Sequence, residues 1–440
     1  MSKMDENFSF KYYGYDRSMS SVTEIPWSQK KAPLSVKLDI ADNPVLSFYN
    51  YAQSYRTAAH LIAERMLAEA QIDELDNYFF PVFFMYRHSV ELLLKCIGFK
   101  VIPSKSDRIQ FMKDTFHDLL AITKYILART TIKRPQEEEK WLLDYFRNIA
   151  SFDKESDSFR YPFHIVRDDS NNDLFHFKKV FSSQTHIDLV GEANKMEAAF
   201  EIIDMWYHDF VETGIEHRAT EYRVCSSSFL DKGGSYYEQS VVGHNPYVLD
   251  FYPYYTGYKE CANYIMKYVT SDIRIDIEKG LTPQHISDNK AWLFYPMCYL
   301  YRNAIELLQK SIIIEFSDIS VTEICKLIRD KKHSICGLYT FIEKEIYCLY
   351  EIDPADNYIN IVKQYCLLLH SFDSDSSRFR YPINKQAMPY QKIVRYQGFD
   401  ALGDFLNKLC NSLEDIRYET HSRKDAIDDM MHEYESYNDY

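Results

Sequence analysis

The chain has 440 residues, of which 46% are hydrophobic and 26% are charged; this excludes wholesale disorder and leaves room for two domains of about 200 residues. Only 12 Gly and 14 Pro occur, which argues against glycine-rich phosphate loops and turn-dense β-sandwiches and favours helices. The 51 basic and 65 acidic residues give a formal net charge of −14, so any contact with nucleic acid requires a local basic patch.

The predicted elements are helices separated by short turns. In chain order from residue 40, the apolar pattern predicts helices at 46–67, at 77–97, directly after His117, at 137–149 and at 187–210. The helix at 77–97 is apolar on most of its circumference, which predicts a buried central helix. Ser151–Pro162 (SFDKESDSFRYP) is expected to form a turn, because Ser and Asp compete for backbone hydrogen bonds and Pro disfavours helix at the residue before it.

The second part of the chain repeats these features in the same order. The matched segments, first copy before second, are 43–55 with 245–258, 86–95 with 301–310, His117 with His333, and 151–162 with 371–382. Four matches in one order indicate a tandem duplication. The first and last helices of the second copy are therefore expected near 248–269 and 399–416.

The duplication divides the chain into five parts. They are an N-terminal extension at 1–39, a first repeat at 40–215, a linker at 216–243, a second repeat at 244–418 and an acidic, Tyr-rich tail at 419–440. The linker contains the only Gly-Gly pair and a run of Ser. The tail is expected to be either a fraying helix or an exposed acidic arm.

Secretion, a membrane span and a metal site find no support in the sequence. The N-terminus lacks the apolar run of a signal peptide, and the most apolar stretch, Tyr78–Ile97, is interrupted by charged residues. The nine cysteines stand singly, without a CxxC pair or a Cys/His cluster of zinc spacing. We therefore expect a cytoplasmic protein with reduced thiols and with neither a metal nor another cofactor.

Three features of each repeat together resemble the HEPN superfamily (higher eukaryotes and prokaryotes nucleotide-binding), whose members are small bundles of four or more helices. The features are an ExxxK helix (Glu91/Lys95 and Glu306/Lys310), a histidine at the start of the next helix (His117 and His333), and Arg-Tyr-Pro before the last helix. The resemblance implies an all-α protein in which two HEPN-like bundles form an intrachain pseudo-dimer.

The resemblance also implies two classes of function. Some members of the superfamily are metal-independent endoribonucleases of bacterial toxins, phage-defence systems and CRISPR effectors, with a motif of Arg, four to six residues and His. Others lack the motif and bind nucleotides or act as scaffolds. Two copies in one chain would supply both halves of a shared site.

Three charged residues on each central helix admit two interpretations. They stand four residues apart and share one helix face: Arg87, Glu91 and Lys95 in the first repeat, and Arg302, Glu306 and Lys310 in the second. One interpretation is a structural ladder, in which Glu pairs with both cations and a carboxylate of the following turn, such as Asp153 or Asp373, neutralises the arginine. The other is a phosphate site that includes Arg87, Lys95, Arg302, Lys310 and also Arg380.

Arg160 and His164 are the candidates for catalysis. Cleavage of RNA without a metal needs a proton acceptor for the 2′-hydroxyl and a cation at the phosphate, and these two residues supply both. Arg380 would be a second phosphate clamp. The second repeat has Asn384 in place of His164, and an amide cannot carry protons, so at most one repeat is catalytic.

We expect two further features to have a structural role rather than a catalytic or binding role. His117 and His333 recur directly before a predicted helix, where we expect them to cap or to pack. The first helix of each repeat is rich in aromatic residues, from Phe48 and from Phe251. Such residues are able to stack on bases, but we interpret them as core.

We expect the protein to bind a nucleotide or RNA phosphate in the groove between its repeats. A bacterial stress or phage-defence setting is implied by the resemblance alone. The alternatives are a metal-independent endoribonuclease that uses Arg160 and His164, and a protein–protein interaction scaffold, which the charge of −14 and the acidic tail favour. The resemblance leaves open a protein partner or antitoxin and a homodimer, and no membrane partner is expected.

Overall fold

The computed structural model describes residues 20–25, 27–28, 32–38, 43–130, 135–168, 173–211, 221–244, 249–349 and 357–438. These residues are mostly helical, as the sequence predicts. All five predicted regions lie partly outside them, above all the N-terminal extension (1–19), the linker (216–220) and the start of the second repeat (245–248). We call 43–211 the N-terminal half and 249–438 the C-terminal half.

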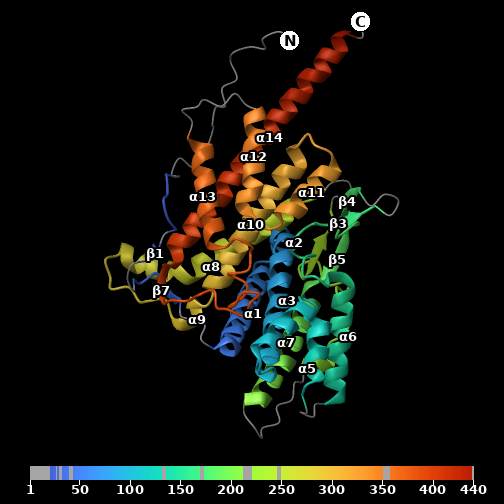
Figure 1. Cartoon of the computed structure of the whole chain (residues 1–440), viewed down its shortest axis with the longest axis vertical. Helices are drawn as coiled ribbons and strands as arrows, with labels where there is room; N and C mark the ends of the chain where they lie inside the picture. Colours follow the sequence, from blue (N-terminus) through green and yellow to red (C-terminus); the bar gives the residue numbers. More distant parts are fainter. Residues whose placement is uncertain are drawn as a thin grey trace.

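Two strands and the N-terminal half come first in the chain (Figure 1). In chain order the elements are β1 (Trp27–Ser28), β2 (Ser35–Leu38), α1 (Pro44–Glu69), α2 (Ile72–Asn77), α3 (Phe79–Val101), α4 (Lys105–Thr115), α5 (Leu119–Leu127), α6 (Gln136–Asp153), β3 (Phe163–Arg167), β4 (Phe175–Lys179), β5 (Thr185–Asp188) and α7 (Leu189–Val211).

A short connection and the C-terminal half follow. Their elements are a 3₁₀ turn η1 (Glu221–Val224), β6 (Gln239–Val242), α8 (Tyr252–Glu278), α9 (Asp288–Ala291), α10 (Phe294–Phe316), α11 (Val321–Lys331), α12 (Ile335–Leu349), α13 (Tyr358–Phe372), β7 (Arg395–Gly398) and α14 (Phe399–Asn438).

Each half is built around one buried helix. All residues of α3 from Phe79 to Phe99 are buried, which confirms the predicted central helix. The helices α1, α4, α5 and α7 pack around α3, and α8, α11, α12 and α14 pack around α10. In Figure 1 the helices around α3 lie below those around α10. The two groups meet where α1 contacts α10 and α8 contacts α3.

Capping residues explain where several helices begin. The Asn43 side chain accepts hydrogen bonds from the backbone of Val45 and Leu46 at the start of α1. Asp118 accepts from the backbone of Ala121 and starts α5, so the His-Asp-Leu motif is a helix start. His117 is thereby placed one residue before the cap.

The short strands were not predicted, and they join the two halves. Strand β2, which precedes α1, pairs with β7, which precedes α14 in the other half. Strand β6, which precedes α8, pairs in the same way with β5, which precedes α7. Strands β3 and β4 form a hairpin whose β4 end contacts α11 of the C-terminal half. The paired strands β2 and β7, like β5 and β6, are far apart in the sequence, and β3 and β4 are only five residues long. Local periodicity therefore gave no signal for these strands.

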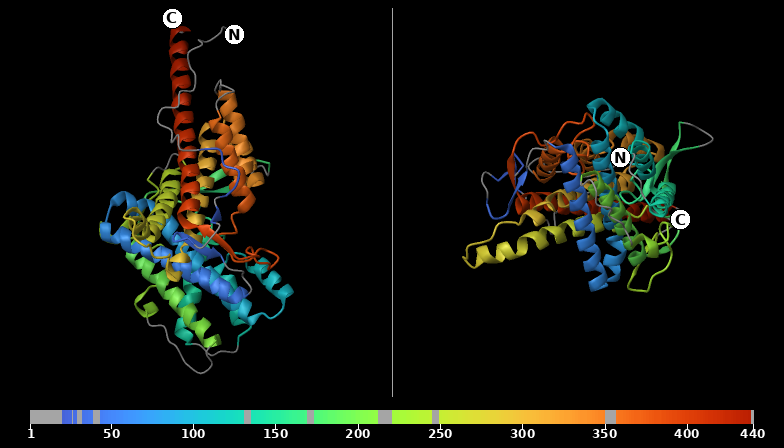
Figure 2. Two further views of the ribbon diagram at one scale, coloured as in Figure 1. Left: turned by 90° about the vertical axis from the view of Figure 1, so that its left-hand side faces the viewer. Right: turned by 90° about the horizontal axis from the view of Figure 1, so that it is seen from below.

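The tail is helical as far as it is described. Helix α14 runs without interruption from Phe399 to Asn438, well beyond the predicted end near residue 416. Figure 2 shows its C-terminal part extending away from the other helices. The glycine at 403 lies against the sulfur of Met266 on α8, so the first turns of α14 approach that helix closely.

Candidate functional site

A cluster of charged residues surrounds Glu91 on the central helix α3. The Glu91 side chain is fully buried. Its Oε1 accepts a hydrogen bond of 2.6 Å from the Lys95 ammonium, and its Oε2 accepts one of 3.3 Å from the Arg87 guanidinium. The predicted ladder of three residues on one helix face is therefore present as contacts.

Arg87 connects this ladder to two other segments. Its Nη2 donates to the main-chain oxygens of His117 at 2.7 Å and of Asp153 at 3.0 Å. Its Nε lies 2.9 Å from the Asp153 carboxylate. The other oxygen of that carboxylate accepts from the backbone of Asp157 and Ser158, which closes the turn after α6. Arg87 thus anchors both the start of α5 and the turn before Arg-Tyr-Pro.

His117 completes the cluster from the start of α5. Its Nδ1 lies 2.9 Å from Glu91 Oε1. Its Nε2 has no hydrogen-bond partner among the described residues, and the side chain is 26% exposed. A histidine held by a carboxylate at Nδ1 presents the lone pair of Nε2 outward. This geometry suits proton transfer or acceptance of a hydrogen bond from a ligand.

A tyrosine from the C-terminal half enters the same cluster. The Tyr381 hydroxyl donates to Glu91 Oε1 at 2.7 Å and lies 3.1 Å from His117 Nδ1. The Lys95 ammonium lies 4.9 Å from the centre of the Tyr381 ring. Glu91 Oε1 therefore accepts from Lys95, His117 and Tyr381 together.

The same contacts occur around Glu306 on α10, with the tyrosine supplied by the N-terminal half. Glu306 accepts from Arg302 at 3.0 Å, Lys310 at 2.7 Å and Tyr161 at 2.6 Å, and His333 Nδ1 lies 3.0 Å away. Arg302 also donates to the main-chain oxygen of His333 and lies 3.6 Å from Asp373. The His333 side chain is 31% exposed. Each half thus completes the cluster of the other.

The environment sets the protonation of both clusters. Burial raises the pKa of Glu91, but the charge of Lys95 and the hydrogen bond with His117 outweigh this and hold it well below its ordinary value; Glu306 behaves alike beside Lys310 and His333. Burial lowers the pKa of His117, and Glu91 offsets only part of that effect. Burial also raises the pKa of Tyr381 well above its ordinary value. At neutral pH each cluster therefore holds an ionised Glu, a neutral His and a protonated Tyr.

The arginines of the two Arg-Tyr-Pro motifs are buried next to these tyrosines. Arg160 donates to Asp157 at 3.1 Å and to the Tyr161 hydroxyl at 2.8 Å. Arg380 donates from Nε to the main-chain oxygen of Ser376 at 2.7 Å. His164 lies on β3, where its Nε2 is 3.4 Å from the Ser158 hydroxyl. Among the described residues no hydrogen bond joins Arg160 and His164, the predicted catalytic pair.

Sequence reasoning placed the arginines of these motifs at the site and missed the tyrosines. Tyr161 and Tyr381 stand directly after Arg160 and Arg380 in both copies of FRYP. The repetition of the whole motif was the available signal, but it did not show that each tyrosine reaches the other half.

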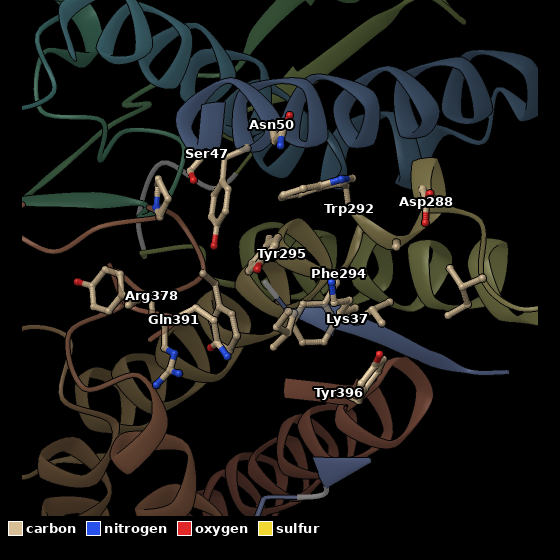
Figure 3. A pocket seen from close by; sticks show the side chains of 18 of the residues that line it. Lys37, Ser47, Asn50, Asp288, Trp292, Phe294, Tyr295, Arg378, Gln391 and Tyr396 are labelled. Atoms are coloured by element: carbon tan, nitrogen blue, oxygen red, sulfur yellow. The ribbon is translucent and has the colours of Figure 1, made fainter. Parts of the chain in front are cut away.

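A pocket of about 720 Å³ lies between the two halves. The N-terminal half contributes Ser47, Asn50 and Tyr51 of α1, and strand β2 contributes Lys37. The C-terminal half contributes Asp288, Trp292, Phe294, Tyr295, Arg378, Gln391 and Tyr396. Figure 3 shows Arg378 and Gln391 at one end of the pocket, Asp288 at the other, and Trp292 and Tyr295 between them.

The aromatic residues of the pocket form a connected group. The Tyr51 ring lies 4.2 Å from the Tyr295 ring and 6.3 Å from the Trp292 ring, measured between centroids. The hydroxyl of Ser54 on α1 donates to the main-chain oxygen of Trp292 at 2.6 Å, which holds this part of the C-terminal half against α1.

Arg378 provides the guanidinium at one end of the pocket. Its Nη1 donates to the main-chain oxygen of Phe372 at 3.0 Å, and its guanidinium lies 4.0 Å from the centre of the Phe372 ring. Burial lowers the pKa of Arg378, the nearby Asp373 carboxylate raises it, and the charge of Arg395 lowers it by a smaller effect.

The corresponding place in the N-terminal half is nearly closed. Backbone contacts identify the counterparts: Asp153 binds the backbone of Ser158 as Asp373 binds that of Arg378, and Val180 binds Pro162 as Tyr390 binds Pro382. By these contacts Ser158 stands for Arg378, and Phe181 for Gln391. There Phe80, which corresponds in sequence to Tyr295, stacks on Tyr254 at 3.8 Å, Phe181 lies beside them, and only about 30 Å³ remains.

Comparisons with family models, with curated proteins and with solved structures give no match. In the part of the chain that the structure describes, no group of three or more His, Cys, Asp or Glu residues is arranged to hold a metal ion. No helix in that part is both long and apolar enough to cross a membrane. The argument for function therefore depends on the two clusters and the pocket.

Proposed function

We propose that this protein binds a nucleotide, or one nucleotide unit of RNA, in the pocket between its two halves. The observation that carries this proposal is one pocket of about 720 Å³ that combines a guanidinium, Arg378, with an aromatic group of Tyr51, Trp292 and Tyr295. Its volume lies within the range of about 300–1,000 Å³ that is usual for small-molecule sites.

Each part of a nucleotide has a matching group in the pocket. The planar fork of Arg378 suits a phosphate, and stacking of a base on an aromatic side chain contributes about 1–3 kcal/mol. Trp292 and Tyr295 lie between Arg378 and Asp288 (Figure 3), so a base that stacks there turns its far edge toward the Asp288 carboxylate. Because the chain carries a net charge of −14, an anionic ligand needs the local charge of Arg378.

The buried arginines and lysines of the clusters were also predicted to bind phosphate. Arg87, Lys95, Arg302 and Lys310 are almost completely buried and already pair with carboxylates. A phosphate there would have to compete with Glu91 or Glu306. Arg378 lies at the wall of the pocket, where its guanidinium donates to a main-chain oxygen and covers an aromatic ring, with the Asp373 carboxylate nearby. Because no side-chain carboxylate accepts a printed hydrogen bond from this guanidinium, we assign the phosphate to the pocket.

Isothermal titration of the protein with AMP, GMP, CMP, UMP and a short single-stranded RNA tests this proposal. The test variant is Arg378→Ser, which copies the counterpart Ser158. The Ser158 hydroxyl donates to the oxygen of Phe152 as Arg378 does to that of Phe372, so the turn keeps its hydrogen bond. Loss of a charge-assisted hydrogen bond should weaken binding roughly 10- to 100-fold.

Two further variants make the result specific. Gln391→Phe copies the N-terminal counterpart and should remove binding by filling the pocket. Arg147→Gln on α6 removes an exposed arginine that pairs with Asp144 and should leave the affinity unchanged. Equal loss in Arg147→Gln and Arg378→Ser, or no binding of any nucleotide to the wild type, would contradict the proposal.

We also propose that the halves arose by duplication and form a HEPN-like intrachain pseudo-dimer. Support comes from the same order of elements in both halves, the exchange of strands β2 and β6, and the exchange of Tyr161 and Tyr381 between clusters. A nucleotide site between two such halves fits a role in stress response or phage defence.

An endoribonuclease is the second candidate, and one observation favours acid–base chemistry in general. His117 and His333 each contact a carboxylate through Nδ1, have side chains that are 26% and 31% exposed, and occur at corresponding places. Incubation of a mixed RNA with the protein in EDTA tests this candidate. Cleavage that Arg160→Ala and His164→Ala abolish would assign it to the predicted pair, whereas cleavage that His117→Gln abolishes would assign it to the cluster. Intact RNA would leave binding as the function.

A further inference from the structure

The end of the pocket opposite Arg378 offers hydrogen-bond acceptors. Asp288 of α9 lies at this end (Figure 3), and His285, three residues earlier in the chain, also lines the pocket. A carboxylate only accepts hydrogen bonds. His285 Nδ1 lies 3.3 Å from the main-chain oxygen of Ala32. Because a carbonyl oxygen only accepts, the proton of a neutral imidazole is on Nδ1, and Nε2 is an acceptor. These two side chains therefore favour a ligand edge that carries donors.

The Asp288 carboxylate is available to a ligand. Asp288 is the first residue of the one-turn helix α9 and is exposed. Among the described residues, its carboxylate forms neither a hydrogen bond nor an ion pair. Trp292, four residues further along, lies between Asp288 and Arg378 in the pocket (Figure 3). A base that stacks on the aromatic group thus has an unpaired carboxylate at its far side.

The two ends of the pocket decide which edge of the base faces Asp288. The proposed function places the phosphate at Arg378 and the base on Trp292 and Tyr295 (Figure 3). In a nucleotide the sugar and phosphate are attached on the side of the base that lies away from its Watson–Crick edge, which single-stranded bases leave open to a protein. With the phosphate at Arg378, the Watson–Crick edge is the one that faces Asp288.

We infer that the ligand of this pocket is a guanine nucleotide and that Asp288 recognises its base, an inference that rests on the proposed function. Of the four RNA bases, only guanine has two adjacent donors on its Watson–Crick edge, N1–H and the 2-amino group. These donors match the two oxygens of one carboxylate.

The other bases place an acceptor opposite the same carboxylate. Adenine and cytosine each have an acceptor nitrogen next to their amino group, and uracil has its N3–H between two carbonyl oxygens. With any of these bases at least one oxygen of Asp288 faces another acceptor, and such an unfavourable contact lowers affinity. The selectivity therefore comes from one matched base and three mismatched ones.

The first repeat has an aspartate at the same position but no open pocket beside it. The offset that pairs Arg87 with Arg302 also pairs Asp73 with Asp288. Both aspartates lie in the first turn of a short helix, where an acidic residue is favourable. Asp73 is exposed and is not among the described residues that line the small pocket of about 30 Å³. Asp73→Asn therefore measures what the shared position contributes to structure alone.

Isothermal titration of the whole protein with GMP, IMP and AMP tests the inference. IMP keeps the N1–H of guanine but lacks the 2-amino group, and AMP has an acceptor at N1. Loss of one hydrogen bond to a carboxylate should make IMP bind roughly 10-fold more weakly than GMP. AMP, which loses the paired contact, should bind roughly 10- to 100-fold more weakly than GMP.

A substitution at Asp288 should change the preferred base. The amide of Asp288→Asn has one acceptor and one donor side, which match xanthine, whose N1–H lies next to a carbonyl oxygen. This variant should bind XMP roughly 10-fold more tightly than GMP, whereas Asp73→Asn should keep the order of the wild type. A gain of affinity for XMP requires a folded pocket, so misfolding cannot produce it.

The outcomes separate this inference from the proposed function. If GMP, IMP and AMP bind the wild type equally, or if AMP binds more tightly, the inference is wrong and the proposed function stands. The same holds if Asp288→Asn binds nucleotides and still prefers GMP to XMP. If that variant does not fold, the order of the three nucleotides in the wild type decides. If no nucleotide binds the wild type, both are wrong.

Discussion

The two clusters are alike, whereas the two places beside them differ. Glu91 and Glu306 each contact an Arg, a Lys, a His and a Tyr, at distances that agree within a few tenths of an ångström. The contact between the arginine and the neighbouring aspartate is longer in the C-terminal half, at 3.6 Å against 2.9 Å. The pocket that contains Arg378 has a volume of about 720 Å³, whereas the corresponding pocket beside Phe181 has about 30 Å³. We interpret the features that the two halves share, such as the clusters, as required for the fold of both, and those that differ, such as the pockets, as specific to one half.

Substitutions at the pocket explain the difference. The open side has Arg378 and Gln391, and their counterparts in the N-terminal half are Ser158 and Phe181. At these two positions the open side is cationic and polar, whereas Phe181 is an aromatic side chain in the lining of the small pocket. A place filled by packed side chains is stabilised by their contacts without any ligand. An open pocket without a ligand lacks these contacts. The asymmetry therefore points to a ligand on the open side.

The largest effect is expected from removing the central carboxylates. Glu91→Gln and Glu306→Gln each leave a buried lysine without its anionic partner and a buried arginine with only the neighbouring aspartate, and such a loss costs about 3–5 kcal/mol. Urea unfolding followed by far-ultraviolet circular dichroism measures the free energy of unfolding. The comparison predicts similar losses in the two halves.

The exposed Glu64 provides the control, since its side chain is 68% exposed and pairs only with His60. Glu64→Gln should change the free energy of unfolding by no more than about 0.5 kcal/mol. A large loss in Glu91→Gln beside a small one in Glu306→Gln would break the likeness of the clusters and make the first a functional site rather than a shared framework.

A smaller effect is expected from the exchanged tyrosines. Tyr381→Phe and Tyr161→Phe each remove one hydrogen bond to an ionised, buried carboxylate, which is worth about 1.5–3 kcal/mol. Because each tyrosine joins the halves, both variants should unfold at lower urea concentrations by similar amounts. Tyr418→Phe on α14, where the tyrosine is 70% exposed, should have no effect. A loss in only one of the two variants would show that the halves are joined on one side.

Much of the helical fold could be predicted from the sequence. The central helix expected at 77–97 is α3 (Phe79–Val101), and the helix expected at 137–149 is α6 (Gln136–Asp153). Periodicity and capping residues are local signals, so they place these two helices to within a few residues, whereas α8 and α14 extend well beyond their predicted ends near 269 and 416. The exchange of β2 and β6 depends on contacts between segments far apart in the chain, and no local pattern records it.

The candidate site could be predicted only where it lies on one helix. The ladder of Arg87, Glu91 and Lys95 follows from a spacing of four residues. The identity of their partners does not follow, because Tyr381 comes from the other half and Trp292 meets Tyr51 only across the interface. Two arginines and two lysines were predicted as phosphate ligands, and in the structure all four are buried and paired with Glu91 or Glu306.

The smallest effect is a dependence of stability on pH that the histidines of both clusters share. Burial lowers the pKa of His117 more than Glu91 raises it; for His333, Glu306 raises the pKa most, but burial together with Arg160 and Lys310 brings the net value below the ordinary one. In the unfolded chain each titrates near about 6.5. Below that pH the unfolded chain binds protons that the folded protein does not, so the free energy of unfolding should fall as the pH drops and level off below the folded pKa.

His117→Gln and His333→Gln each remove one of these protons, so each should make the fall of stability below pH about 6.5 shallower and change little above it. Urea titrations across this range measure the slope. His60→Gln, at a residue whose side chain is 54% exposed, should leave the slope as in the wild type. If only His117→Gln changed the slope, the two clusters would differ in protonation as the two pockets differ in volume. The Glu91 cluster would then be the better candidate for acid–base catalysis.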